Sequence, residues 1–160
     1  MDLDQDIPTI GELVHRRKGS KATVPLEVVS CNIGYGNGVS VGGSKYVLVL
    51  VDQCTTNSFV YGMHGSSGAD VCEALWKFFI DAGGFPKTLQ CHFDTRLIGG
   101  KAAALLQSHG TRIRAAPPHR QDKNGSVERK WQSLTKMARS FLTAAKLPKK
   151  FWFWALSLQL

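Results

Sequence analysis

The chain has 160 residues, of which 43% are hydrophobic and 20% are charged. This composition excludes wholesale disorder and is typical of one domain with its own core. No apolar run approaches the roughly 20 residues of a membrane helix, and the acidic start is not followed by the apolar stretch of a secretory signal. We therefore expect an intracellular protein, in the nucleus or cytoplasm, that is not secreted and has no membrane contact.

The chain is strongly basic, since 20 Lys and Arg residues against 12 Asp and Glu residues give a formal net charge of +8. A basic domain usually binds a polyanion, most often nucleic acid. The four cysteines form no C-x-x-C pair, so a zinc knuckle is not expected. The sequence motifs of phosphate-binding loops, serine hydrolases and zinc proteases are absent. We expect a DNA-binding protein without a small-molecule substrate.

The first part of the chain is predicted to form a tail and then three strands. Residues 1–25 combine an acidic start with a basic stretch over 15–21, which we interpret as a solvated linker or, alternatively, as an arm that touches phosphate. The Gly-rich segment 32–43 precedes a strand and not a helix, so it is not a dinucleotide-binding loop. Apolar, β-branched segments predict consecutive antiparallel strands at 26–30, 46–52 and 58–63.

Helices and strands alternate in the rest of the chain. Apolar residues at helical spacing predict a helix over 67–82, which Ser67 caps and Gly83 ends. The other segments are predicted as a strand at 88–93, a helix at 100–109, a strand at 111–115 and a long helix at 126–145. The long helix is expected to bury Val127, Trp131, Leu134, Ala138, Phe141, Leu142 and Ala145. Pro148 stops it, and a further helix begins at 151.

This order of elements predicts an α/β protein with a mixed five-stranded sheet and helices on both faces. The order β-β-β-α-β-α-β-α is similar to that of the ribonuclease-H-like fold. On the long helix, Glu128 falls about 90° from the centre of the buried face, at about 100° per residue. Arg129, Lys136 and Arg139 lie on the outer side. One acidic residue is therefore expected where the core borders a basic surface.

Several segments resemble the integrases of Ty1/copia-type retrotransposons. Residues 123–142, which begin KNGSVERK, resemble the N-G-x-x-E-R and M-A-R segment of that family. Residues 117–121 stand where the family has a flexible loop, and Phe151–Ala155 (FWFWA) resembles its F-W-x-x-A sequence. Asn32–Gly36 and residues 46–61 resemble the first hairpin of the family.

The resemblance covers nearly the whole chain and implies its domain organisation. We expect residues 26–160 to form an integrase catalytic core-like domain with a truncated C-terminal helix, and residues 1–25 to lie outside it. The zinc module that precedes this core in the family does not precede it here, and the sequence ends inside a helix. We therefore expect a fragment or a truncated reading frame.

Enzymes of this family use three carboxylates to hold two Mg²⁺ or Mn²⁺ ions for polynucleotidyl transfer. The resemblance implies that the third carboxylate is Glu128, and the family spacing places the other two at Asn32 and His92. Asparagine offers a neutral oxygen and histidine a nitrogen, which Mg²⁺ accepts poorly. We therefore expect a catalytically degenerate site at Glu128, Asn32 and His92, which binds these metals weakly or not at all.

Alternatives to this interpretation remain open at the level of sequence. Asp94 lies two residues beyond His92, so it could join Glu128 in holding a metal, or it could cap the following helix. Asp52 could project toward the site or bond to its own turn. A zinc site at His92 and Glu128 lacks further ligands.

The resemblance also implies a nucleic-acid-binding surface, expected at Lys123, Asn124, Arg129, Lys130, Lys136 and Arg139. Contacts from these side chains would be mainly to the phosphate backbone. The main hypothesis is thus a retrotransposon integrase core-like domain whose active site has decayed, and we expect a homodimer. One alternative is a non-catalytic nucleic-acid-binding or oligomerising module on the same fold. Another is a metal-dependent nuclease that acts through Asp94 and Glu128.

Overall fold

The computed structural model describes residues 22–36, 38–117 and 125–160. The predicted basic stretch at 15–21 and the loop residues 118–124 lie outside the described residues. Lys123 and Asn124 are therefore not placed.

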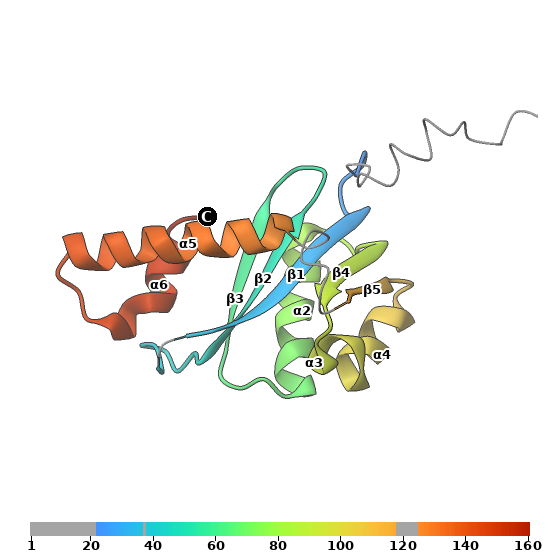
Figure 1. The fold of residues 1–160 in the computed structure, drawn as a ribbon. Coiled ribbons are helices and arrows are strands. Elements are labelled where there is room, and N and C mark those ends of the chain that lie inside the picture. Colours follow the sequence, from blue (N-terminus) through green and yellow to red (C-terminus); the bar gives the residue numbers. More distant parts are fainter. Residues whose placement is uncertain (1–21, 37, 118–124) are drawn as a thin grey trace, which may run out of the picture.

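The centre of the fold is a five-stranded mixed sheet (Figure 1). Its strands are β1 (Val28–Tyr35), β2 (Tyr46–Asp52), β3 (Ser58–Met63), β4 (Thr88–His92) and β5 (Arg112–Ala116). The spatial order is β3-β2-β1-β4-β5. Strands β1, β2 and β3 pair antiparallel, whereas β4 pairs parallel with both β1 and β5. The predicted α/β architecture with a mixed five-stranded sheet is confirmed.

Helices cover both faces of this sheet, each over its own apolar core (Figure 1). One face carries α2 (Gly68–Ala82), α3 (Thr95–Ile98) and α4 (Gly100–Ser108). The other face carries α5 (Gly125–Ala144), the short 3-10 helix η2 (Lys149–Phe151) and α6 (Trp152–Ser157). Because side chains alternate along a strand, β2 sends Leu48 and Leu50 into the first core and Val47 and Val49 into the second.

The predicted helix at 67–82 is confirmed together with its ends. Ser67 is the N-cap of α2, and its hydroxyl accepts a hydrogen bond from the backbone N–H of Asp70 while the Asp70 carboxylate accepts from the N–H of Ser67. Gly83 follows the helix in the left-handed conformation, with a φ of 77°. This reciprocal capping fixes the start of α2, and glycine lets the chain turn at its end without a Cβ clash.

The predicted first strand exists, but its predicted bounds of 26–30 were wrong. Leu26 has a φ of 61° and lies in the turn before the strand, and β1 runs on to Tyr35. Pairing with β2 continues from Val29 opposite Asp52 to Tyr35 opposite Tyr46. The antiparallel partner thus holds a Gly-containing segment extended, and Asn32 lies inside the strand instead of at its end.

Two glycines of this region are explained by tryptophans of the opposite layer. A Cβ atom at Gly34 would lie 2.7 Å from the Trp131 ring, and one at Gly36 would overlap the Trp152 ring. Glycine inside a strand often marks a close approach by another group. The first contact places α5 on β1, and the second places the start of α6 on the residue that follows β1.

The buried face of α5 is narrower than predicted. Val127, Leu134, Ala138 and Leu142 are buried, whereas Phe141 is 39% exposed. Trp131 is half-buried, and Ala145 is exposed beyond the end of the helix. Phe141 lies one position before the buried Leu142 and is therefore rotated by about 100° from it toward the rim.

The helix α3 was not predicted from the sequence. It has a single turn, capped by the side chain of Asp94. Such a short helix has no periodic apolar pattern to detect. Among the described residues, no helix is long and apolar enough to span a membrane.

We expect Gly34→Ala to destabilise the fold by about 1–3 kcal/mol, because the new methyl group would force the Trp131 ring out of its position on β1. The measurement is the free energy of unfolding in urea. The matched control is the same substitution in a Trp131→Ala background, where the methyl group meets no ring. An equal loss of stability in both backgrounds would contradict the proposed contact.

Candidate active site

The three positions that the sequence singled out meet on one face of the sheet. In the parallel pairing of β1 with β4, Cys31 lies beside Cys91, and both side chains enter the core under α2. The next residue on each strand, Asn32 and His92, therefore faces the opposite side. Glu128 approaches that side from the first turn of α5.

Contacts on either side of Asn32 show which part of α5 it faces. The hydroxyl of Ser126 donates to the Ser30 hydroxyl at 3.2 Å, two residues before Asn32 on the same face. The Trp131 ring covers Gly34, two residues after it. Asn32 is half-buried between these two contacts, opposite the start of α5.

His92 and Glu128 are in direct contact. The imidazole Nε2 lies 2.6 Å from the Oε1 of Glu128, and the two side chains are 30% and 32% exposed. Neutral histidine donates one N–H to this carboxylate, and protonated histidine adds an ion pair. In either state the carboxylate that the resemblance assigns to metal binding is bonded to a side chain instead.

Asp94 is held by its own helix. Its Oδ1 accepts from the backbone N–H of Arg96 at 3.0 Å, and the Arg96 guanidinium binds it through Nε at 2.8 Å and Nη2 at 2.6 Å. The side-chain bond from Arg96 lowers the pKa of Asp94 below its ordinary value of 3.8. The structure thus shows the helix-capping alternative for Asp94, and both carboxylate oxygens have partners.

Asp52 is also used locally. It is 3% exposed, and its carboxylate accepts from the N–H of Cys54 at 3.0 Å and from the Thr55 hydroxyl at 3.0 Å. These bonds close the turn between β2 and β3, as expected for an aspartate at the end of a hairpin strand.

The residues present do not fit a pair of magnesium ions. A hard divalent cation needs several oxygen ligands. A pair of such cations also needs several carboxylates, whose negative charge balances that of the metals. This site offers an amide, an imidazole and one carboxylate that the imidazole already binds. Within 22–36, 38–117 and 125–160, no group of three His, Cys, Asp or Glu residues could hold a metal ion. We therefore derive no metal-dependent step for this chain.

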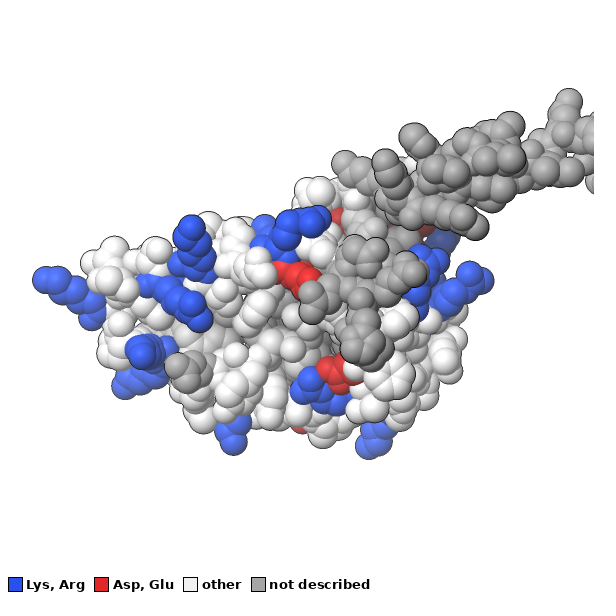
Figure 2. Space-filling view, viewed as in Figure 1, with Lys and Arg blue, Asp and Glu red and all other residues white. Residues whose placement is uncertain are grey.

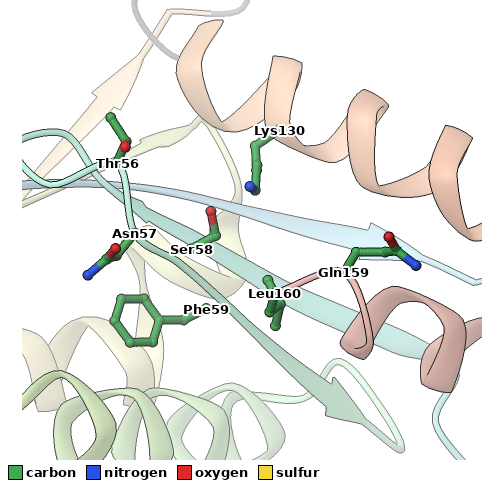
Figure 3. A pocket seen from close by; sticks show the side chains of 7 residues that line it. All are labelled: Thr56, Asn57, Ser58, Phe59, Lys130, Gln159 and Leu160. Atoms are coloured by element: carbon green, nitrogen blue, oxygen red, sulfur yellow. The ribbon is translucent and has the colours of Figure 1, made fainter.

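The predicted DNA-binding residues on α5 divide between two flanks. Arg129, Lys136 and Arg139 are exposed, as predicted, on the outer side of the helix. Figure 2 shows Lys and Arg side chains along the layer that α5 forms. Lys130 is half-buried on the opposite flank, where it lines a surface hollow of about 390 Å³ above β3 (Figure 3). The other lining residues are Thr56, Asn57, Ser58, Phe59, Gln159 and Leu160. The site at His92 and the hollow at Lys130 are therefore separate.

Sequence reasoning missed two arginines near the site. Arg112 and Arg114 pair with Thr88 and Gln90 across β4 and β5, and Gln90 in turn pairs with Ser30. Paired residues point to the same face, so both arginines lie on the side of His92, and both are exposed. The signal was the alternation in the segment TRIRA, which places two cations on one face of a strand.

Comparison with known proteins confirms the predicted resemblance. The chain is 25% identical over 156 residues to the retrovirus-related Pol polyprotein from transposon RE2 of Arabidopsis thaliana. This match covers 89% of the chain and 10% of the polyprotein. It is 28% identical over 117 residues to the retrovirus-related Pol polyprotein from transposon TNT 1-94 of Nicotiana tabacum. This match covers 71% of the chain and 9% of the polyprotein. The chain thus spans about a tenth of the length of the curated relatives it matches. No protein-family model matches it.

Similar solved structures share the fold at low sequence identity. A chain of the simian T-cell lymphotropic virus intasome in complex with the PP2A regulatory subunit B56 gamma superposes with a TM-score of 0.72 and 15% identity, covering 87% of this chain and 48% of that one. The catalytic core domain of BIV integrase superposes with a TM-score of 0.63 and 13% identity, covering 82% and 79%. The HTLV-2 integrase catalytic core domain in complex with magnesium superposes with a TM-score of 0.63 and 14% identity, and the match covers 83% of this chain and 84% of that one.

The fold is therefore that of the integrase catalytic cores, which is ribonuclease-H-like. In sequence, the chain is similar to the Pol polyproteins of the plant retrotransposons RE2, RE1 and TNT 1-94.

The bond between Asp94 and Arg96 predicts a pH-dependent stability. A carboxyl group with a lowered pKa in the folded state stabilises the fold above its unfolded pKa, and this contribution disappears as the pH falls through the folded pKa. We expect Arg96→Gln to lower the free energy of unfolding near neutral pH, and the difference from wild type to shrink below about pH 4. Urea unfolding of both proteins over a pH series measures this difference in the free energy of unfolding. The control is Arg114→Gln, which removes an exposed arginine away from Asp94; a pH-independent Arg96→Gln effect would contradict the assignment.

Proposed function

We propose that this chain is a copia-type integrase core-like domain that binds DNA through phosphate contacts and no longer performs two-metal transfer. The observation that carries the proposal is the 2.6 Å contact between His92 and Glu128. It occupies the remaining carboxylate of the three that the resemblance assigns to the site. The similarity to transposon Pol polyproteins and to the integrase fold supports the nucleic-acid part of the proposal.

The loss of transfer chemistry follows from the charge and ligands of the site. Three carboxylates would place about three negative charges beside two divalent ions, whereas Asn32, neutral His92 and Glu128 place one. Asp94 does not restore the missing charge, because Arg96 binds both of its oxygens. A nuclease acting through Asp94 and Glu128 would have to break both of these pairings first.

The basic surface of α5 supports contact with DNA. Arg129, Lys136 and Arg139 are exposed beside the site, and the ion pairs of the described residues involve none of them. Cations without acidic partners keep their full charge for phosphate. We expect weak sequence preference, since phosphate contacts carry no base information.

Self-association belongs to the same proposal. The HTLV-2 integrase core similar to this chain is described in a trimeric form, so the fold is compatible with assembly. In this chain, Ile80 and Trp76 on α2 are 74% and 43% exposed, on the face of the sheet away from the site. A homodimer that covers this helix would leave the basic surface of α5 open.

Restoring the carboxylates tests the metal part of the proposal. We expect Asn32→Asp/His92→Asp to bind Mn²⁺ at least about tenfold more tightly than the wild type, because it frees Glu128 and adds two negative charges. Isothermal titration calorimetry measures the affinity, and strand-transfer and nicking assays with Mg²⁺ and Mn²⁺ run in parallel. The control, Asn57→Asp/His64→Asp, makes the same changes away from the site. Wild-type nicking that Glu128→Ala abolishes would contradict the proposal.

Salt dependence tests the DNA part. We expect Lys136→Gln/Arg139→Gln to weaken binding to a DNA duplex and to reduce the slope of log K against log salt by about 0.9 for each lost phosphate contact. Fluorescence anisotropy with a labelled duplex measures both. Lys77→Gln/Lys101→Gln removes the same charge from α2 and α4 on the other face of the sheet and is expected to leave the slope unchanged. A wild type that does not bind DNA at low salt would refute this part.

A further inference from the structure

The positive charge of the chain is concentrated in its last part. Residues 129–160 contain seven of the 20 Lys and Arg residues and none of the 12 Asp and Glu residues. Three of the seven, Lys146, Lys149 and Lys150, lie between α5 and α6: Lys146 in the turn after α5, and Lys149 and Lys150 in η2. All three are exposed. In Figure 2, the end of the molecule where α5 meets η2 shows Lys and Arg side chains and no acidic ones.

The turn is held to the body of the fold. The backbone N–H of Val41 donates to the carbonyl of Lys150 at 2.7 Å. Two residues later, the indole N–H of Trp152 donates to the carbonyl of Gly38 at 3.1 Å. These bonds anchor the turn to the loop between β1 and β2. The lysines therefore project from a fixed position and not from a free end.

The backbone at Lys146 is unusual for a lysine. The N–H of Lys146 donates to the Thr143 carbonyl and the N–H of Leu147 to the Leu142 carbonyl, which is the pattern of a Schellman turn. Lys146 occupies its left-handed position, with a φ of 52°. This conformation strains a residue that has a Cβ atom and favours glycine.

Two other helices of the chain end with the same pattern and do carry glycine. Gly83 closes α2 and Gly110 closes α4, each with a φ of 77°. Only at the end of α5, among these three, does a charged side chain stand in the strained position. Leu26 and Thr56 also have a positive φ, so the conformation by itself does not assign a role to Lys146. A non-glycine residue in this position is a reason to ask what its side chain does.

We infer that Lys146, Lys149 and Lys150 form a second phosphate-binding surface, the α5–α6 turn surface, for the backbone of a DNA duplex. It is separate from the candidate site, because the part of α5 from Glu128 to the helix end at Ala144 is about 24 Å long at about 1.5 Å per residue. Exposed cations without acidic neighbours complement the phosphate backbone. The inference rests on the proposed function and adds a second contact region to it.

A stabilising role for the charge is the competing explanation, because a cation at a helix C-terminus interacts favourably with the helix dipole. That role concerns Lys146 alone and does not require Lys149 or Lys150. The two explanations predict different effects of the same substitution, since glycine removes both the strain and the charge.

The test uses the full chain, a labelled 20-base-pair duplex and a salt series. For Lys146→Gly we expect an unchanged or higher melting temperature together with weaker binding and a salt slope smaller by about 0.9. For Lys149→Gln/Lys150→Gln we expect an unchanged melting temperature and a slope smaller by about 1.8. The matched control is Lys77→Gln/Lys101→Gln, which we expect to retain the wild-type slope.

Each contrary result has a distinct meaning. If the wild type binds the duplex and both turn variants bind as it does, the inference is wrong and the proposed function stands. Equal losses in the turn variants and in the control would show a net-charge effect and would also overturn the inference. Loss of binding to phosphatidylserine vesicles alone, with duplex binding intact, would assign the surface to a membrane instead. A wild type that binds no duplex would refute the proposed function itself.

Discussion

The seating of α5 on β1 is the contact on which the candidate site depends. The hydroxyl pair of Ser126 and Ser30 fixes the start of the helix, and the Trp131 ring fills the space above Gly34. These two contacts flank Glu128, which lies next to His92. The register of β1 with β4 places Asn32 beside them.

Under the proposed function, these contacts would keep the shape of the site although its chemistry is lost. The His92 imidazole is the partner of the Glu128 carboxylate. A half-buried carboxylate without a partner is costly, and a hydrogen bond to histidine removes that cost. The fold therefore does not need a metal ion to satisfy Glu128. Arg96 has the same effect on Asp94.

The two faces of the sheet also differ in their charged side chains. On the other face of the sheet, Glu73 on α2 and Asp94 at the start of α3 form ion pairs, whereas the layer formed by α5, η2 and α6 has no acidic residue after Glu128. A polyanion approaching this layer meets cations from the site to the α5–α6 turn surface. Arg112 and Arg114 extend the same charge along the sheet edge on the other side of His92.

Much of this could be predicted from the sequence by itself. Helical periodicity, the Ser67 cap and the Gly83 stop determined α2, and β-branched runs determined β2 and β3, because these signals act between near neighbours in the chain. The segment NGSVER placed Glu128 at the border of a buried helix face. The net charge indicated the kind of partner.

The tertiary structure decided the rest, because the interactions involved join residues far apart in the sequence. The extension of β1 through Asn32 came from pairing with β2, and its glycines were accounted for only once Trp131 and Trp152 lay against them. Whether Asp94 faced a metal or capped a helix depended on Arg96 and on a turn too short to leave a pattern. The bond between His92 and Glu128, 36 residues apart, exists only because β4 and α5 meet at one face of the sheet.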